Sequence, residues 1–144
     1  MKSRIFHTQS EDETIALGER LAAELPAKAV VLLIGNLGAG KTTLAKGIVK
    51  GLGVAERSDV SSPTFTLIHE YSPSVYHIDL YRLDTPAQVA TLGLDEIFDR
   101  RAVVLIEWGE KFPQLMPQDR IEIRLRAAGE NSREIEISEP LLTV

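Results

Sequence analysis

The sequence predicts an α/β domain of three layers, in which helices cover both faces of a mainly parallel central sheet. Residues 29–34 (Ala-Val-Val-Leu-Leu-Ile) and 102–106 (Ala-Val-Val-Leu-Ile) are apolar throughout, without alternation. Such runs are typical of strands that are buried on both faces, as in parallel sheets. Helical patterns occur between the predicted strands, and this mixture favours the three-layer architecture.

The bulk composition indicates one globular domain over residues 1–144, with 44% hydrophobic and 26% charged residues. The absence of Cys excludes disulfides and thiolate metal sites. No signal-peptide pattern and no apolar run of about 20 residues is present, so we expect a cytoplasmic protein without membrane contact. A net charge of −5 disfavours direct binding of DNA or RNA, because such binding depends on neutralising phosphates.

The first expected element is an amphipathic helix. Ser10 and Glu13 fit a capping box, and leucines recur every four residues from Leu17 to Leu25, until Pro26 interrupts the pattern. The strand at 29–34 then runs into a glycine-rich loop. A second helix follows this loop, since apolar residues repeat at 44, 48 and 52 before a glycine.

The middle of the chain predicts two strands and a short helix. A polar loop precedes a strand at 64–71, and a second strand follows at 75–80. Thr85 and Pro86 form the N-cap and first position of a helix over 87–92, which the next glycine ends.

The C-terminal part alternates between apolar and charged residues in two segments. Ile121, Ile123 and Leu125 belong to the first segment, and Ile135 and Ile137 to the second, with a polar turn between them. This pattern predicts an antiparallel hairpin.

Residues 35–42 (Gly-Asn-Leu-Gly-Ala-Gly-Lys-Thr) match the P-loop pattern G-x-x-x-x-G-K-[ST], between an expected strand and an expected helix. Lys41 is expected to reach the β and γ phosphates of ATP, and Thr42 to bind Mg²⁺. The elements therefore predict a P-loop NTPase fold, although no residue distinguishes ATP from GTP. The residues expected to contact the nucleotide are Asn36, Leu37, Gly38, Ala39, Gly40, Lys41, Thr42 and Thr43.

Two carboxylates are candidates for the magnesium site, because each ends a predicted strand at the rim where ligands bind in such sheets. These are Asp79 and Glu107. One of them is expected to act as metal ligand and the other to position an attacking water, and the sequence leaves their roles open. The alternative is that either acid caps its strand or pairs with Arg82.

Residues 61–66 (Ser-Ser-Pro-Thr-Phe-Thr) lie between the P-loop helix and the Asp79 strand. Thr64 is the candidate for a hydroxyl that senses the γ phosphate, as switch loops of GTPases do. An ordinary loop with Ser/Thr turn bonds explains the segment equally well.

Four other side chains carry weaker signals. Trp108 is interpreted as a core residue rather than a platform for a base. His7, His69 and His77 show no metal-binding spacing, and no chemistry is assigned to them.

The chain closely resembles the TsaE (YjeE) family in four motifs that occur in the family's order. The motifs are Gly-Asn-Leu-Gly-Ala-Gly-Lys-Thr-Thr (35–43), Ser-Pro-Thr-Phe (62–65), His-Ile-Asp-Leu-Tyr-Arg (77–82) and Glu-Trp (107–108). The resemblance implies the ATPase component of bacterial tRNA threonylcarbamoyladenosine (t6A) synthesis, which modifies adenosine 37. It implies the partners TsaD and TsaB, contact with tRNA only through their complex, and no transferase activity of its own.

The resemblance also implies roles for single residues. Lys41 binds phosphate, Thr42 binds Mg²⁺, and Asp79 takes the Walker B position. Glu107 becomes a metal-shell or water-positioning residue, and Thr64 a switch residue.

The family places the start of the first helix near the adenine, so Ser10 or Glu11 is expected to touch the bound ATP or ADP. Asn36 stands where many relatives have Asp, a change that removes a charge from the loop.

Two alternatives to this ATPase remain at the level of sequence. One is a P-loop kinase for a small metabolite, for which Arg100 and Arg101 are the unassigned cations. The other is a nucleotide-dependent binding module without meaningful hydrolysis, in which Asp79 and Glu107 only hold the metal.

Overall fold

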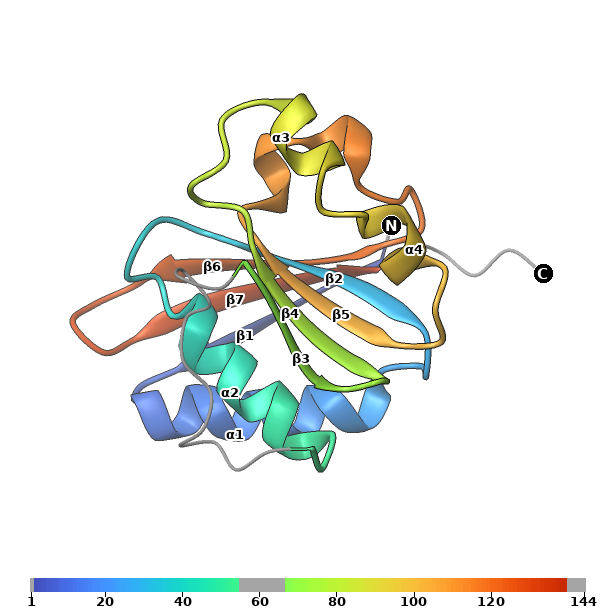
Figure 1. Ribbon diagram of the computed structural model, residues 1–144. Coiled ribbons are helices and arrows are strands. Elements are labelled where there is room, and N and C mark those ends of the chain that lie inside the picture. The colour runs from blue at the N-terminus through green and yellow to red at the C-terminus, as the bar shows by residue number, and fades with distance from the viewer. Residues whose placement is uncertain (1, 55–66, 140–144) are drawn as a thin grey trace.

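The computed structural model describes residues 2–54 and 67–139, which build one seven-stranded sheet with helices on both faces (Figure 1). The strands are β1 (Lys2–Thr8), β2 (Ala29–Ile34), β3 (Ile68–Ser72), β4 (Val75–Asp79), β5 (Val103–Glu107), β6 (Ile121–Ala127) and β7 (Arg133–Glu139).

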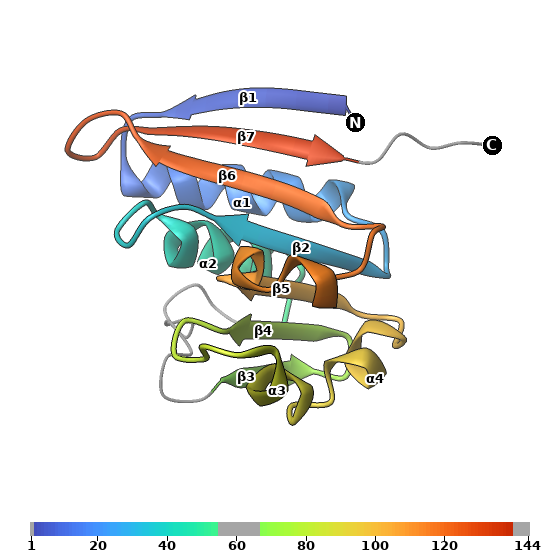
Figure 2. The ribbon, with the colours of Figure 1, turned by 90° about the horizontal axis from the view of Figure 1, so that it is seen from above.

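The sheet has the strand order β1-β7-β6-β2-β5-β4-β3 (Figure 2). Its centre is parallel, because β2 pairs in parallel with β5 and with β6, and β5 with β4. Antiparallel pairs lie towards both edges, where β6 pairs with β7, β7 with β1, and β4 with β3. The predicted C-terminal hairpin is thus confirmed as β6 and β7. Its strand β6 also pairs with β2, the strand that precedes the P-loop.

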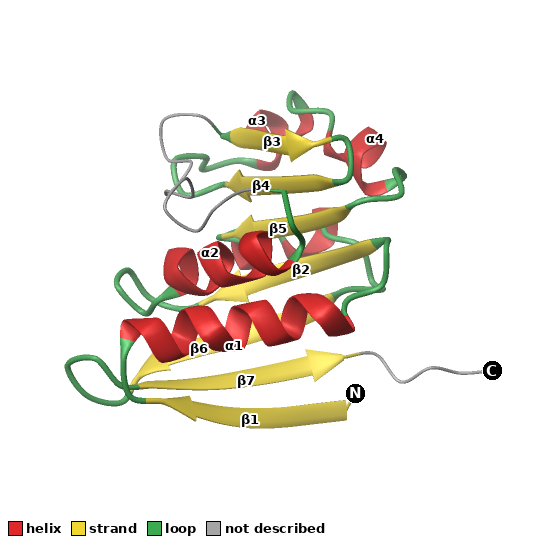
Figure 3. Ribbon diagram, turned by 90° about the horizontal axis from the view of Figure 1, so that it is seen from below, coloured by secondary structure: helices red, strands yellow, loops and turns green. Residues whose placement is uncertain are grey.

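The two long helices, α1 (Glu11–Glu24) and α2 (Lys41–Gly51), cover one face of the sheet (Figure 3). Short helices cover part of the opposite face: α3 (Pro86–Ala90), α4 (Leu94–Phe98) and the 3-10 helices η2 (Gly109–Lys111) and η3 (Pro113–Leu115) (Figure 2). The predicted three-layer α/β fold is confirmed. No helix in the described ranges is long and apolar enough to cross a membrane.

Strand alternation divides the core into two clusters. Val31 and Leu33 of β2 point into the cluster under α1 and α2, whereas Val30 and Leu32 point into the cluster under the short helices. Apolar residues on both sides of one strand explain its unbroken hydrophobic run. On β4 the same alternation places Val75, and with it positions 77 and 79, on the face of α2.

The first element is strand β1, so the expectation that α1 comes first was wrong. Of the two apolar side chains of this strand, Phe6 packs on the core, while Ile5 is 57% exposed. Pairing with β7, far away in the sequence, supplies the strand's backbone hydrogen bonds. The predicted Ser10 cap of α1 is present, with Glu13 N–H donating to Ser10 Oγ at 3.1 Å. The return bond of the predicted capping box is shifted by one residue, because Glu13 Oε1 accepts at 3.0 Å from the N–H of Gln9 and not from that of Ser10.

The region after β4 also differs from the prediction. The helix expected at 87–92 spans Pro86–Ala90, with the predicted Thr85 cap in place. Gly93, expected to end it, has a φ of 67° and precedes a further helix, α4, which the sequence did not predict. Leu94 and Ile97 of α4 are buried, so tertiary packing holds this short helix. The strand expected at 64–71 is described from Ile68, and residues 64–66 lie outside the described part of the chain.

Helices α1 and α2 cross at two glycines. A Cβ built on Gly47 would lie 2.1 Å from the carbonyl oxygen of Ile15, and one built on Gly18 would lie 2.6 Å from that of Leu44. Only residues without a Cβ permit this approach of the two backbones. The crossing fixes α2, and thereby the loop that leads into it, against the sheet.

We predict that Gly47→Ala destabilises the protein by about 2 kcal/mol, in the range of overpacking mutations. Alanine within a helix ordinarily gains about 0.5–1 kcal/mol over glycine, so the backbone clash reverses the usual sign. Urea unfolding followed by circular dichroism measures the change. Gly129→Ala is the matched control, because its nearest neighbouring atom lies 3.6 Å from the new Cβ. A stability of Gly47→Ala equal to or above that of the parent would contradict this account of the crossing.

Candidate functional site

The parallel strands β2, β5 and β4 end side by side at the same edge of the sheet. Asp79 of β4 pairs in register with Glu107 of β5, and Glu107 pairs with Leu33 near the end of β2. The P-loop begins directly after β2. The sheet register therefore brings the glycine loop and both predicted carboxylates to the same place.

The loop reaches α2 through two glycines in the left-handed region, Gly38 with φ 80° and Gly40 with φ 103°. Side chains rarely adopt these angles, so glycine at both positions is explained. Gly40 is the N-cap of α2 and gives the helix no side-chain cap. The first N–H groups of α2 and the positive end of its dipole are thus available to an anion.

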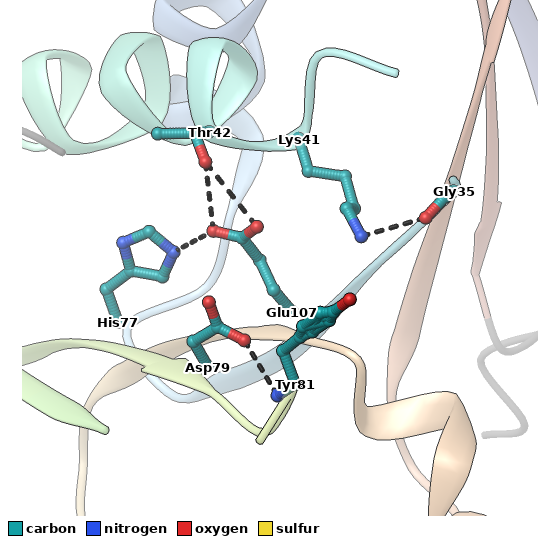
Figure 4. Close-up of polar contacts among 7 residues, drawn as sticks. All are labelled: Gly35, Lys41, Thr42, His77, Asp79, Tyr81 and Glu107. Carbon is teal, nitrogen blue, oxygen red and sulfur yellow. Dashed lines mark hydrogen bonds and ion pairs between the residues drawn. The ribbon is translucent and has the colours of Figure 1, made fainter. Parts of the chain in front are cut away.

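Lys41 is the first residue of α2 and is only 4% exposed. Its Nζ donates to the carbonyl oxygen of Gly35 at 2.8 Å (Figure 4). The same Nζ lies 3.5 Å from the centroid of the Trp108 ring. Burial lowers the pKa of the Lys41 ammonium below the ordinary lysine value of 10.5. The negative charges of Glu107, Glu110 and Asp79 act in the opposite direction, in decreasing order. The ammonium is therefore largely buried, yet Lys41 lines a cleft that a phosphate can enter.

Glu107 is 3% exposed and accepts hydrogen bonds from two elements (Figure 4). Thr42 Oγ1 of α2 lies 3.3 Å from its Oε2 and 3.5 Å from its Oε1. His77 Nε2 of β4 lies 2.7 Å from Oε2. The carboxylate is consequently held between the P-loop helix and the neighbouring strand.

Asp79 is also 3% exposed and is oriented by the turn that follows it. Its Oδ1 accepts a hydrogen bond from the backbone N–H of Tyr81 at 2.9 Å (Figure 4). The Tyr81 ring, whose residue is 40% exposed, stacks on Trp108 with 5.2 Å between centroids. Two aromatic rings thus border the acidic side of the site.

Two adjoining clefts flank the start of α2. The first, of about 310 Å³, lies on the side of the carboxylates and of Trp108. The second, of about 240 Å³, lies on the side of Glu11 at the start of α1. Gly40, Thr43 and Arg133 line both clefts. An extended ligand can therefore lie across the loop with one end in each cleft.

The structure brings together most of the residues predicted for the site. The first cleft is lined by Leu37, Gly38, Gly40, Lys41, Thr42, Thr43, Asp79 and Glu107, and the second by Glu11. Two predicted side chains are elsewhere, since Ala39 is 4% exposed in the core and Asn36 lines a separate hollow beside Arg124. Thr64 lies outside the described residues.

Sequence reasoning missed three contributors. His77 was given no chemistry, although it stands two positions before Asp79 and so faces the same side of the sheet. Trp108 was interpreted as core, and it does pack, half-buried, against the cluster under the short helices, but it also lines the first cleft and has a φ of 67°. Arg133 of β7 donates to the carbonyl of Gly38 at 3.2 Å. This last contact joins distant parts of the chain and leaves no pattern in the sequence.

The oxygen donors at the first cleft fit Mg²⁺, which favours hard oxygen ligands. They are the Thr42 hydroxyl and the carboxylates of Asp79 and Glu107. Within the described ranges no cluster of three or more His, Cys, Asp or Glu side chains is arranged to hold a metal by itself.

Comparison with known proteins gives consistent results. The family model "Threonylcarbamoyl adenosine biosynthesis protein TsaE" matches residues 8–135. A tRNA threonylcarbamoyladenosine biosynthesis protein TsaE from Bacillus subtilis is 41% identical over 138 residues, which cover 94% of this chain and 85% of that protein. One from Nostoc is 42% identical over 143 residues, with the same coverage. The crystal structure of Bacillus subtilis YdiB superposes with a TM-score of 0.78 and 36% identity, covering 96% of this chain and 86% of that one.

The electrostatics of the site predict how Lys41 responds to its neighbours. We expect Glu107→Gln to lower the pKa of Lys41 further, because the strongest of the three supporting charges is lost, and Asp79→Asn to lower it less. NMR titration of protein labelled with ¹³C at the lysine side chains measures both shifts. A Lys41 signal that both substitutions leave unshifted would contradict the described geometry.

Proposed function

Because this chain belongs to the TsaE family and has a role in tRNA threonylcarbamoyladenosine biosynthesis, we propose that it serves this process by hydrolysing ATP. One observation carries the proposal. Lys41, Thr42, Asp79 and Glu107 converge on a single cleft at the end of the P-loop strand. These are the side chains that phosphoryl transfer to water requires in P-loop proteins.

In the proposed complex, ATP lies across the P-loop with its phosphates at the start of α2. Backbone N–H groups and the ammonium of Lys41 bind the phosphate oxygens. The N-terminal end of α1, at Glu11, faces the nucleoside. Thr42 and Asp79 would hold Mg²⁺, with Glu107 beside its water shell, and the ion would offset phosphate charge. ADP occupies the same place after the reaction.

The hydrolysis breaks the bond between the γ phosphorus and the oxygen that bridges to ADP, while a water oxygen bonds to that phosphorus. Glu107 positions this water and accepts its proton, since a buried carboxylate is an acceptor with a fixed direction. Lys41 stabilises the negative charge that gathers on the departing ADP oxygen. Inorganic phosphate and ADP leave, and Glu107 returns its proton to solvent.

We further propose that TsaD and TsaB are the partners of this chain in the cytoplasm, and that tRNA is contacted only through them. The net charge of −5 supports this division, because the chain itself is poorly suited to neutralising tRNA phosphates. Thr64 is retained as the residue that couples nucleotide state to these partners, on the strength of its sequence position alone.

The two alternatives have less support. A kinase would need a cation near the phosphates and the acceptor molecule. Arg100 instead donates to the hydroxyl of Tyr76, on the face of the sheet opposite to α2. A module that only binds nucleotide would use Glu107 to hold the metal, and the rate of phosphate release in Glu107→Gln distinguishes that role from catalysis.

The test of the proposed function is phosphate release from ATP by the purified chain, alone and with TsaD and TsaB. We expect slow release that the partners accelerate. Release that requires a small-molecule acceptor would instead indicate a kinase, and binding without release under all conditions would indicate a binding module.

We predict that Glu107→Gln lowers the rate of phosphate release by about 100-fold or more, as expected for a group that positions and deprotonates water. The affinity for ATP is expected to change much less, because the P-loop contacts remain. A fluorescent ATP analogue measures the affinity in the same preparation. Glu136→Gln, a carboxylate of β7 away from the cleft, is the matched control. An unchanged rate in Glu107→Gln would remove Glu107 from the reaction.

A further inference from the structure

We propose that His77 is a positioning residue, whose Nε2–H fixes the carboxylate of Glu107 in the direction that hydrolysis needs. This inference rests on the proposed function in one respect, the reaction that Glu107 serves. The contact itself is independent of any nucleotide. Figure 4 shows His77 on the side of Glu107 opposite to Lys41.

The direction of this hydrogen bond follows from the chemistry of its two atoms. His77 Nε2 lies 2.7 Å from Glu107 Oε2, a short hydrogen bond between side chains that are 0% and 4% exposed. An ionised carboxylate only accepts hydrogen bonds, so Nε2 carries the proton whatever the state of the other ring nitrogen. His77 is therefore the donor.

The placement of His77 serves this one contact. It occupies the row of β4 that faces α2, between Val75 in the apolar core and Asp79 at the rim. Its other ring nitrogen, Nδ1, is buried and has no hydrogen-bond partner among the residues that the structure describes. A buried polar atom without a partner costs free energy, and an apolar side chain would avoid that cost. The histidine at this position is therefore explained by the hydrogen bond that its Nε2 makes to Glu107.

The groups around Glu107 explain why its orientation has to be fixed. Lys41 is close enough for its pKa to respond to the charge of Glu107, and its Nζ points to Gly35. Without the bond to His77, the carboxylate is free to rotate towards this ammonium. Among the residues that the structure describes, only Thr42 would then hold it by a hydrogen bond, at 3.3 Å and from a hydroxyl that is itself expected at the metal. His77 keeps one carboxylate oxygen engaged and leaves the other for a water or the ion.

Three variants separate this role from packing. His77→Leu removes the donor and keeps an apolar side chain of similar size in the core row. His77→Gln keeps an amide N–H near the place of Nε2. His69→Leu is the matched control, because His69 pairs with His77 across β3 and β4 but stacks on Tyr71. Thermal unfolding establishes that each variant is folded.

The first readout needs no nucleotide. In protein labelled with ¹⁵N at histidine, we expect a proton on Nε2 of His77 that is protected from exchange with solvent. His77→Gln identifies this signal among the three histidines. Glu107→Gln is expected to shift it, whereas Glu136→Gln is not. A rapidly exchanging signal, or one that ignores Glu107→Gln, would overturn the proposed contact.

The second readout is phosphate release. We expect His77→Leu to lower kcat by about 10- to 100-fold, the usual effect of removing a partner that orients a metal-site ligand, with KM for ATP changed by less than about threefold. His77→Gln is expected to recover most of the loss. In a Glu107→Gln background, His77→Leu is expected to add less than about threefold, because the residue acts through Glu107.

The outcomes distinguish the inference from the proposed function. If the parent chain releases no phosphate even with its partners, the proposed function fails, and the histidine signal still tests the contact. If the parent is active and His77→Leu is equally active, or loses as much in the Glu107→Gln background, the positioning role is refuted. A loss shared by His77→Gln would likewise refute it, since that variant retains the donor.

Discussion

The site depends on the parallel register of β2, β5 and β4. This register places Asp79 beside Glu107 and ends both strands level with the start of the P-loop. Because successive side chains of a strand face opposite sides, a shift of one residue in β4 would turn Asp79 and His77 away from α2. Apolar residues on both faces of β2 and β5 bury these strands at the centre of the sheet, and the chemistry follows from where the strands end.

Burial of charge is the second constraint, and it acts on the same groups. Lys41, Asp79 and Glu107 are all at most 4% exposed, and His77 is fully buried. Burial removes water from these charged groups, and hydrogen bonds within the protein replace part of their hydration. Lys41 donates to Gly35, Asp79 accepts from the backbone of Tyr81, and Glu107 is bonded to Thr42 and His77. Fixed dipoles and charges of this kind need little rearrangement when a charged ligand arrives. The lowered pKa of Lys41 expresses the same balance, because its burial is only partly offset by the nearby carboxylates.

Local sequence patterns predicted the parts of the fold that depend on local interactions. The runs before the P-loop and before Glu107, the helix N-cap at Ser10 and the C-terminal hairpin were all correctly interpreted, because each has its own periodicity or cap. Strand β1 was missed, since only one of its apolar side chains packs on the core and its partner lies at the other end of the chain. Helix α4 was missed because five residues carry too little periodicity.

The same division applies to the site. Lys41, Thr42, Asp79 and Glu107 were predictable, because a motif or the end of an apolar strand marks each one. His77 had a detectable signal, its spacing from Asp79, but its meaning required the neighbouring strand. Arg133 and the orientation of Trp108 had none, since both result from how distant segments meet.

The most direct test of the central claim, that this cleft binds a magnesium nucleotide, is isothermal titration calorimetry of ATP into the purified chain with Mg²⁺ and with EDTA. The account predicts one ATP per chain, tighter binding with Mg²⁺ than without, and a loss of at least about tenfold in affinity for Lys41→Met, as expected when a charged hydrogen-bond donor to phosphate is removed. Binding of equal strength in Lys41→Met, or no binding heat by the parent chain, would contradict it.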